Sequence, residues 1–205
     1  MSVEAAKDVL LPFPTARHLV PASTQFRSTW LSVSLRSLRE RNLFDAYLAS
    51  IPDGYRDAVQ STVVGVWLPV GVAVAHYHAC DALDLPPSEI FAIGSEVTKR
   101  VHGTLLTTAV RLATEAGVTP WTILAQLNRI WGRIWIGGGV GVFRLGPKEA
   151  RLEIVGWPCS SVPYTRVAMR GVLTAMSDMF CSKTYVSEVG RLCTSTTLGY
   201  RIAWA

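Results

Sequence analysis

The feature that most constrains the fold is a change of hydrophobic periodicity at the glycine run Gly137–Gly139. Before this run, apolar residues recur at the three- and four-residue spacings of amphipathic helices. After it, "VGVFRL" and "ARLEIV" flank the turn "GPKE" and read as the two strands of a hairpin. A helical pattern in "YTRVAMRGVLTAMSDMF" and a second hairpin in "KTYVSEVGRLCTSTTLGYRIAWA" follow. Helices followed by β-β-α-β-β predict an α+β domain, with one antiparallel sheet packed by helices.

The chain length and the pattern breaks suggest one domain with an extension. At 205 residues the chain can bury a substantial core. Residues 1–25 contain prolines and little periodicity, so we interpret them as an irregular lead-in. Residues 26–205 are interpreted as a single α+β domain. Within it, "LPPSEIFAIGSEVTKRVHGTLLTTAVRLATEAG" gives the longest helical pattern, and "TPWTILAQLNRIWGRIW" predicts one further helix capped by Thr119.

Composition and charge exclude several classes of protein. Hydrophobic residues make up 49% of the chain and charged residues 17%, which is not the composition of a disordered chain. The net charge is +5, but the basic residues are scattered and no nucleic-acid-binding motif accompanies them, so we predict no nucleic-acid partner. The most apolar run, "VVGVWLPVGVAVA", contains Pro69 and is shorter than the roughly 20 residues of a transmembrane helix. Without a secretory signal pattern, we expect a cytoplasmic protein whose cysteines are reduced.

No motif of a known catalytic chemistry is present. The chain lacks G-x-S-x-G, a P-loop, G-x-G-x-x-G and H-E-x-x-H. The glycine-rich "GGGVGVF" lacks the Lys-Ser/Thr of a phosphate-binding loop and leads into a predicted strand. We therefore predict a protein that is not an enzyme and has no catalytic residues.

Several longer segments resemble a known family. "RNLFDAYLASIPDGYRDAV", "WLPVGVAVAHYHACDALDL", "GVTPWTILAQLNRIWGRIW", "FRLGPKEARLEIVG" and "TTLGYRIAWA" are similar to a myxobacterial family of proteins. The element order resembles a superfamily that unites 4-vinyl-reductase-type domains, haem–nitric-oxide-binding sensor domains and Bet3-type subunits of vesicle-tethering complexes. The resemblance covers residues 26–205 and implies the fold more than the function, because it brings no catalytic motif.

The resemblance also raises the question of a metal or a haem. In 4-vinyl-reductase-type domains a glutamate and two cysteines near the terminal hairpin help to hold zinc. Glu188 and Cys193 match the first two, but Tyr200 or a neighbour stands where the second cysteine is expected. His76 and His78 point about 200° apart on a helix and cannot easily share one ion. The Tyr-x-Ser-x-Arg motif of the haem sensors is absent, so we predict no metal and no cofactor, leaving open a metal role for Glu188 and Cys193.

Two functions of different class remain. The first is a sensory or regulatory domain that binds a small apolar ligand between the helices and the sheet. The seven tryptophans could line such a cavity, although tryptophans also simply fill cores. The alternative is a protein–protein adaptor, dimeric like the tethering-complex subunits, with no small-molecule ligand. The low charge content suits either function, and a homodimer is compatible with both.

The candidate ligand site is placed by glycines in the longest predicted helix. Gly94 and Gly103 each weaken a helix by about 1 kcal/mol relative to alanine, so we expect something to use the space they leave. That is either a cavity between this helix and the sheet, with Tyr77 or His102 as a polar anchor, or another helix packed closely against the glycines. The predicted ligand-binding residues are Tyr77, Val97, Val101, His102, Leu105, Trp121, Trp131 and Trp135.

Overall fold

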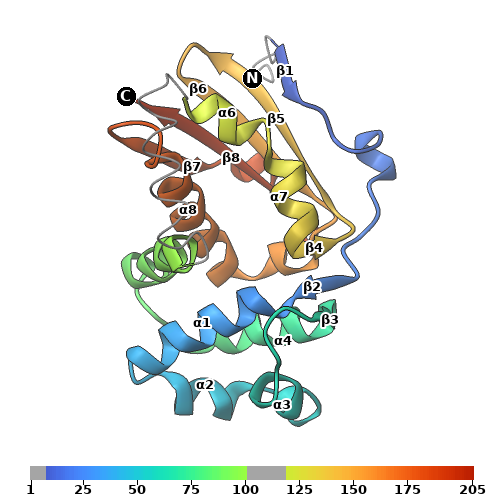
Figure 1. Ribbon diagram of the computed structural model, residues 1–205, viewed down its shortest axis with the longest axis vertical. Coiled ribbons are helices and arrows are strands. Elements are labelled where there is room, and N and C mark those ends of the chain that lie inside the picture. The colour runs from blue at the N-terminus through green and yellow to red at the C-terminus, as the bar shows by residue number, and fades with distance from the viewer. Residues whose placement is uncertain (1–7, 101–118) are drawn as a thin grey trace.

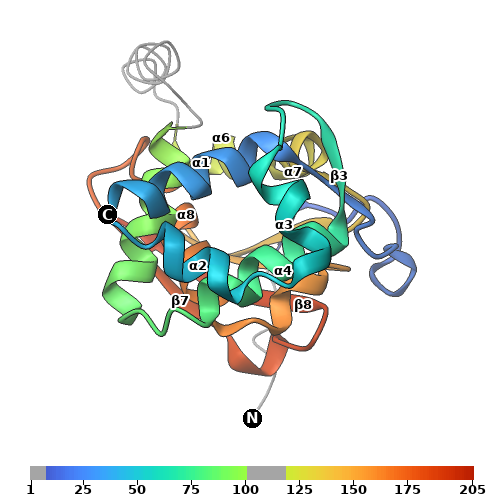
Figure 2. The ribbon, with the colours of Figure 1, turned by 90° about the horizontal axis from the view of Figure 1, so that it is seen from below.

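A helical half and a sheet half pack against each other in the computed structural model, which describes residues 8–100 and 119–205 (Figure 1). The helical half contains α1 (Ser28–Glu40), α2 (Phe44–Ser50), α3 (Asp53–Gln60) and α4 (Val70–Asp81). Seen from below, α2 and α3 lie nearest the viewer, with α1 and α4 between them and the sheet half (Figure 2). A further helical segment, residues 87–100, lies beside α8 (Pro163–Ser177).

The main sheet is antiparallel throughout and has the strand order β1-β5-β6-β8-β7. Its strands are β1 (Asp8–Leu11), β5 (Gly139–Gly146), β6 (Glu149–Val155), β7 (Thr184–Glu188) and β8 (Thr197–Trp204). The helices α6 (Pro120–Leu124), α7 (Leu127–Ile134) and α8 lie over one face of this sheet (Figure 1). The predicted α+β class, with helices packed on an antiparallel sheet, is confirmed.

A small three-stranded sheet ties the two halves together. Its strand order is β3-β2-β4, formed by β2 (Gln25–Arg27), β3 (Trp67–Pro69) and β4 (Trp135–Ile136). In this sheet Phe26 pairs with Leu68 on one side and with Trp135 on the other. The chain between α1 and α4 is thereby anchored to the end of α7.

The closing hairpin lies inside the main sheet. Strand β8 pairs with β6 from Thr197 to Ala203 and with β7 on its other side. Tyr200, Ile202 and Trp204 are buried, as their alternation predicts, whereas Arg201 is exposed. One hydrophobic cluster includes these side chains together with residues of α1 and α4.

Residues 8–11 are a strand rather than part of an irregular lead-in. Strand β1 pairs with β5, so the sheet gains an edge strand from the beginning of the chain. The segment that follows crosses the outer face of the sheet, where glycines of β5 leave room for its side chains. A Cβ on Gly141 would lie 2.7 Å from the ring of Phe13, and one on Gly139 would lie 2.8 Å from Pro14.

The segment that crosses the outer face of the sheet also buries Glu153. This residue alternates with Leu152 and Ile154 along β6, a pattern that predicts an exposed side chain. Glu153 is 5% exposed and accepts ion pairs from Arg17 (3.1 Å) and Arg151 (3.0 Å). The charge is compensated on both sides, which is what allows a carboxylate to be buried there.

The single helix predicted for residues 120–135 is broken. Helix α6 ends at Leu124 and α7 begins at Leu127. After the break, the Asn128 side chain accepts a bond from the Val140 N–H and donates one to the Pro12 carbonyl, both at 2.9 Å. The turn thus places α7 where Asn128 can fasten it to β5 and to the crossing segment.

Within residues 8–100 and 119–205, no helix is both long enough and apolar enough to cross a membrane. The apolar run that contains Pro69 is divided between a loop, β3 and the amino-terminal part of α4.

Candidate functional site

The main candidate site is a cavity of about 350 Å³ between α7, α8 and the inner face of the main sheet. Helix α7 contributes Ile130 and Ile134 to its wall, and β6 contributes Leu152 and Ile154. Helix α8 contributes a row of residues one turn apart: Met169, Val172, Leu173 and Met176. Arg133, an exposed residue of α7, is the charged side chain in the described part of the lining.

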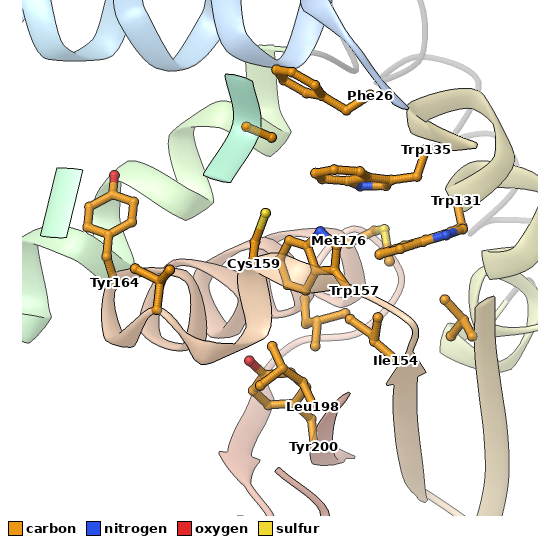
Figure 3. Close-up of a cluster of buried hydrophobic side chains, with 14 of the residues drawn as sticks. Phe26, Trp131, Trp135, Ile154, Trp157, Cys159, Tyr164, Met176, Leu198 and Tyr200 are labelled. Carbon is orange, nitrogen blue, oxygen red and sulfur yellow. The ribbon is translucent and has the colours of Figure 1, made fainter. Parts of the chain in front are cut away.

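Three tryptophans form one wall of the cavity (Figure 3). The rings of Trp131 and Trp135 stack with centroids 5.7 Å apart. Trp157 meets both edge to face, at 5.8 Å from Trp131 and 5.5 Å from Trp135. The Trp131 indole N–H donates to the Gly137 carbonyl at 2.9 Å, which fixes the orientation of that ring. Such offset and edge-to-face contacts stabilise aromatic clusters beyond their buried area.

A second, much smaller cavity of about 30 Å³ shares part of this wall. Trp30, Trp157, Met169 and Val172 line both cavities. The smaller one has space for about one water molecule. It lies between α1, the helical segment 87–100 and α8, on the side of the main cavity that faces the helical half.

The predicted ligand-binding residues are divided between these places. Trp131 and Trp135 line the main cavity, and Tyr77 and Val97 line the smaller one. Trp121 lines neither, because its ring packs against Trp204 with centroids 4.6 Å apart.

The remaining three, Val101, His102 and Leu105, lie outside the described residues. The lining residues that the sequence analysis does not select are chiefly Trp157 and the row on α8. The α8 row had a visible signal, since Val172, Leu173 and Met176 lie on the apolar side of that helical pattern.

Gly94 does not open space for a ligand on the side where a Cβ would lie. A Cβ on Gly94 would lie 2.0 Å from the carbonyl oxygen of Ala168, so this glycine allows the close approach of α8. The inference that Gly94 makes room for a ligand is therefore wrong, and the alternative of close helix packing applies. The main cavity lies against α7 and α8 instead, with Thr98 of the long helix at its wall. Gly103 lies outside the described residues.

The buried histidine belongs to a separate polar network. His76 accepts or donates at both ring nitrogens, with Tyr47 Oη 2.8 Å from Nδ1 and Ser34 Oγ 3.0 Å from Nε2. Burial lowers the pKa of His76 to about 3, so its ring is neutral near pH 7. The network joins α1, α2 and α4 and contributes no residue to the wall of the main cavity.

The described residues contain no group of three or more His, Cys, Asp or Glu side chains that could hold a metal ion. Glu188 lies 3.5 Å from Arg166, and the half-buried Cys193 thiol lies 3.5 Å from the Val189 carbonyl. Burial raises the pKa of the Cys193 thiol.

Comparison with solved structures identifies the fold. The Fe(II) unliganded H-NOX protein from K. algicida matches with a TM-score of 0.62 and 9% identity, over 87% of this chain and 96% of that one. An oxygen-binding H-NOX domain related to soluble guanylate cyclases matches with a TM-score of 0.54 and 12% identity, over 87% and 94%. An H-NOX structure from work on heme distortion matches with a TM-score of 0.58 and 12% identity, over the same shares. No family model and no curated protein matches the chain.

These likenesses show that the chain has the fold of haem–nitric oxide/oxygen-binding (H-NOX) domains, which is the fold that the predicted superfamily resemblance implies. The narrower similarity to a myxobacterial family stays a prediction.

The described lining of the main cavity does not fit a haem by itself. Haem iron is held by histidine, cysteine, methionine or tyrosine side chains, and methionine holds it beside a histidine. Met169 and Met176 are the side chains of these types in the described lining. His76 lies outside the lining, and both its ring nitrogens are engaged. The described lining therefore offers no histidine for the iron.

Proposed function

We propose that this chain is a non-catalytic sensory or regulatory domain that holds a small apolar molecule in the main cavity. The observation that supports this most directly is the cavity itself, about 350 Å³ with walls of tryptophan, methionine and aliphatic side chains. Its volume falls within the range of small-molecule sites, about 300–1,000 Å³. The H-NOX fold adds support, because one neighbour is named as an oxygen-binding domain.

Apolar contact would supply most of the binding free energy. Each buried CH₂ group of a ligand contributes about 0.8 kcal/mol. The described lining has one charged side chain, Arg133, and its exposure places it where the wall meets solvent. We therefore expect neutral, largely hydrocarbon molecules to be preferred over ions, because burying an unpaired charge is costly.

The position of the cavity suggests how occupancy could be signalled. Its walls come from α7, α8 and the sheet, so a bound molecule would make contacts with all three at once. Filling the space adds dispersion contacts that an empty cavity lacks. Occupancy would then favour one arrangement of α7 relative to α8, and a partner could read that arrangement on the protein surface.

The proposal is tested with the bicyclic hydrocarbon tetralin and a matched pair of variants on α7. Ile130→Trp places a large ring at the cavity wall, whereas Arg129→Trp changes an exposed neighbour that is outside the lining. Tetralin at about 100 times its Kd should raise the Tm of the wild type and of Arg129→Trp by about 5–10 °C. Ile130→Trp should show little or no shift. Failure of the wild type to bind tetralin, by calorimetry and by thermal shift, would contradict the proposal.

A dimeric adaptor remains the second candidate, because of one exposed apolar strip. Val63, Val64 and Val66 are 67%, 63% and 40% exposed on the loop that leads from α3 into β3. Contiguous apolar residues at a surface often mark a protein-binding site. Three results together would favour the adaptor function. The wild type would be a homodimer by light scattering, Val64→Lys would be a monomer, and tetralin would not bind.

A further inference from the structure

We propose that the ligand of the main cavity carries a neutral hydrogen-bond acceptor, such as a ketone, aldehyde or ether oxygen, which accepts a hydrogen bond from the indole N–H of Trp157. This inference rests on the proposed function, since it specifies the chemistry of a molecule bound in the same cavity. It concerns which apolar molecules are preferred, and it can fail while the cavity still binds hydrocarbons.

The observation behind it is an unpartnered donor in the cavity wall. Trp157 is 1% exposed, and its indole nitrogen is buried without a hydrogen-bond partner among the described residues. Buried polar groups in folded proteins nearly always have a partner, so each exception calls for an explanation. Trp157 lines both cavities and lies centrally among the labelled side chains of Figure 3. A ligand in the main cavity would therefore lie against this ring, and the proposed hydrogen bond requires the ring to turn its N–H, which the surrounding side chains bury, towards the ligand.

Two neighbouring tryptophans have hydrogen-bonded indole donors. The Trp131 N–H donates to the Gly137 carbonyl at 2.9 Å, and the Trp121 N–H donates to the Pro147 carbonyl at 3.1 Å. Among the tryptophans of the described residues, Trp157 is the one whose buried nitrogen has no such partner. A phenylalanine would fill much of the same space without leaving a donor unpaired.

A competing explanation is an interaction with a ring face. Trp157 meets Trp135 edge to face, with centroids 5.5 Å apart and planes at 73°, so its N–H could be directed at the Trp135 π-system. Such N–H···π contacts are weak, and a carbonyl or ether oxygen is a stronger acceptor. The two explanations differ in the affinities that they predict. If the N–H is available to a ligand, an oxygen-bearing ligand should bind more tightly than its hydrocarbon analogue; if the N–H is directed at the Trp135 ring, it should not.

The chemistry of the wall also defines the acceptor. Trp157 can donate but cannot accept, so an ammonium group gains nothing from it. A carboxylate at this depth would be a buried charge, and Arg133, the charged side chain of the described lining, is exposed to solvent. A neutral oxygen on a mainly hydrocarbon body is the group that fits both constraints.

The test compares 1-tetralone with tetralin, which has the same bicyclic skeleton without the carbonyl oxygen. We expect the wild type to bind 1-tetralone about 3- to 10-fold more tightly than tetralin, which is the net effect of one neutral hydrogen bond. In Trp157→Phe this ratio should fall to about that of the partition of the two probes between water and an apolar solvent.

Trp131→Phe is the matched control, because it removes an indole from the same wall whose N–H is already bonded to Gly137. It should weaken the binding of both probes and leave their ratio unchanged. A second measurement needs no variant: the carbonyl stretch of bound 1-tetralone should lie at a lower infrared frequency than in hexane. The corrected ratio is the observed ratio divided by the ratio of the water-to-hydrocarbon partition coefficients of the two probes.

The outcomes separate this inference from the proposed function. If both probes bind the wild type with a corrected ratio of one and an unshifted carbonyl stretch, the acceptor proposal is wrong and the apolar cavity stands. The same holds if Trp131→Phe and Trp157→Phe lower the ratio equally. If neither probe binds the wild type, the proposed function itself fails.

Discussion

Gly94 and Gly171 face the main chain of each other's helix at a single crossing point. A Cβ on Gly94 would lie 2.0 Å from the Ala168 carbonyl oxygen, and one on Gly171 would lie 2.1 Å from the Phe91 carbonyl oxygen. The Ser95 hydroxyl adds a hydrogen bond to the Gly171 carbonyl at 3.1 Å. The helical segment 87–100 is thus held against α8, one of the walls of the main cavity.

This crossing predicts a strong effect for a single methyl group. Gly94→Ala should lower the free energy of unfolding by about 1–3 kcal/mol, because the methyl group meets main-chain atoms that cannot move independently. Gly132→Ala is the control, since Gly132 is an exposed helical residue with nothing within 4 Å of an added Cβ. That substitution should raise the free energy of unfolding by about 0.5–1 kcal/mol. Urea denaturation measures both, and equal effects of the two variants would contradict the close packing.

The buried histidine predicts how stability depends on pH. The pKa of His76 is about 3 in the folded protein and about 6.5 in the unfolded chain, so the unfolded state binds the proton between these values. Its contribution to stability is fully present above pH 6.5 and is lost as the pH falls towards 3. Between pH 6.5 and pH 5 the free energy of unfolding should decrease by about 1–2 kcal/mol through this group.

The control for that prediction lies two residues further along the same helix. His78 is exposed on α4, so His78→Gln should keep the decrease between pH 6.5 and pH 5. His76→Gln should remove it, whatever the substitution does to stability at pH 7. Denaturant titrations at several pH values supply the comparison, and an unchanged slope in His76→Gln would rule out this origin.

The inner position of β8 predicts that the closing hairpin is needed for folding. A chain that ends at Ser195 lacks β8 and leaves β6 and β7 without a partner between them. It should show no cooperative unfolding transition by circular dichroism. Ile202→Ala should lower the free energy of unfolding by about 2–5 kcal/mol, because Ile202 is fully buried. Val9→Ala, at a 51% exposed position of the edge strand, should change it by at most about 0.5 kcal/mol.

We also predict that the purified protein is colourless. The described lining of the cavity offers no histidine to a haem iron, and the sequence lacks the haem-sensor motif. The absorption spectrum should therefore show no Soret band, both as purified and after incubation with haemin and removal of the excess. A stable Soret band would show that the cavity or its surroundings accept a haem. Haem would then replace a small apolar molecule as the proposed ligand.

The helices and strands can be predicted from the sequence better than the contacts and cavities between them. The alternation of Tyr200, Ile202 and Trp204 is a local signal, and it correctly predicts a buried strand face. Gly94 carries no comparable signal, because a glycine that admits a ligand and one that admits a helix look the same until the neighbouring element is known. The pattern of residues 8–11 does not predict β1 for a related reason, since a short edge strand is defined by its distant partner rather than by its own pattern.

The cavity shows the same limit. Trp131 and Trp135 can be selected from the spacing of the single helix predicted over residues 120–135, but Trp157 follows a strand and gives no periodic signal. Its relevance depends on an unbonded indole nitrogen, which is a property of the assembled wall. To decide whether these tryptophans line a ligand site or fill a core, one must know the volume of the cavity between the packed side chains, and the sequence does not contain it.

The segment that crosses the outer face of the sheet has a consequence for synthesis in the cell. Arg17 and Glu153, which pair across that face, are 136 positions apart in the chain. A ribosome that adds about 5–20 residues per second needs about 7–27 s between the two. During that time Phe13 and the edges of β1 have no sheet to cover them, so the nascent chain offers an apolar, strand-forming stretch to chaperones until its second half emerges.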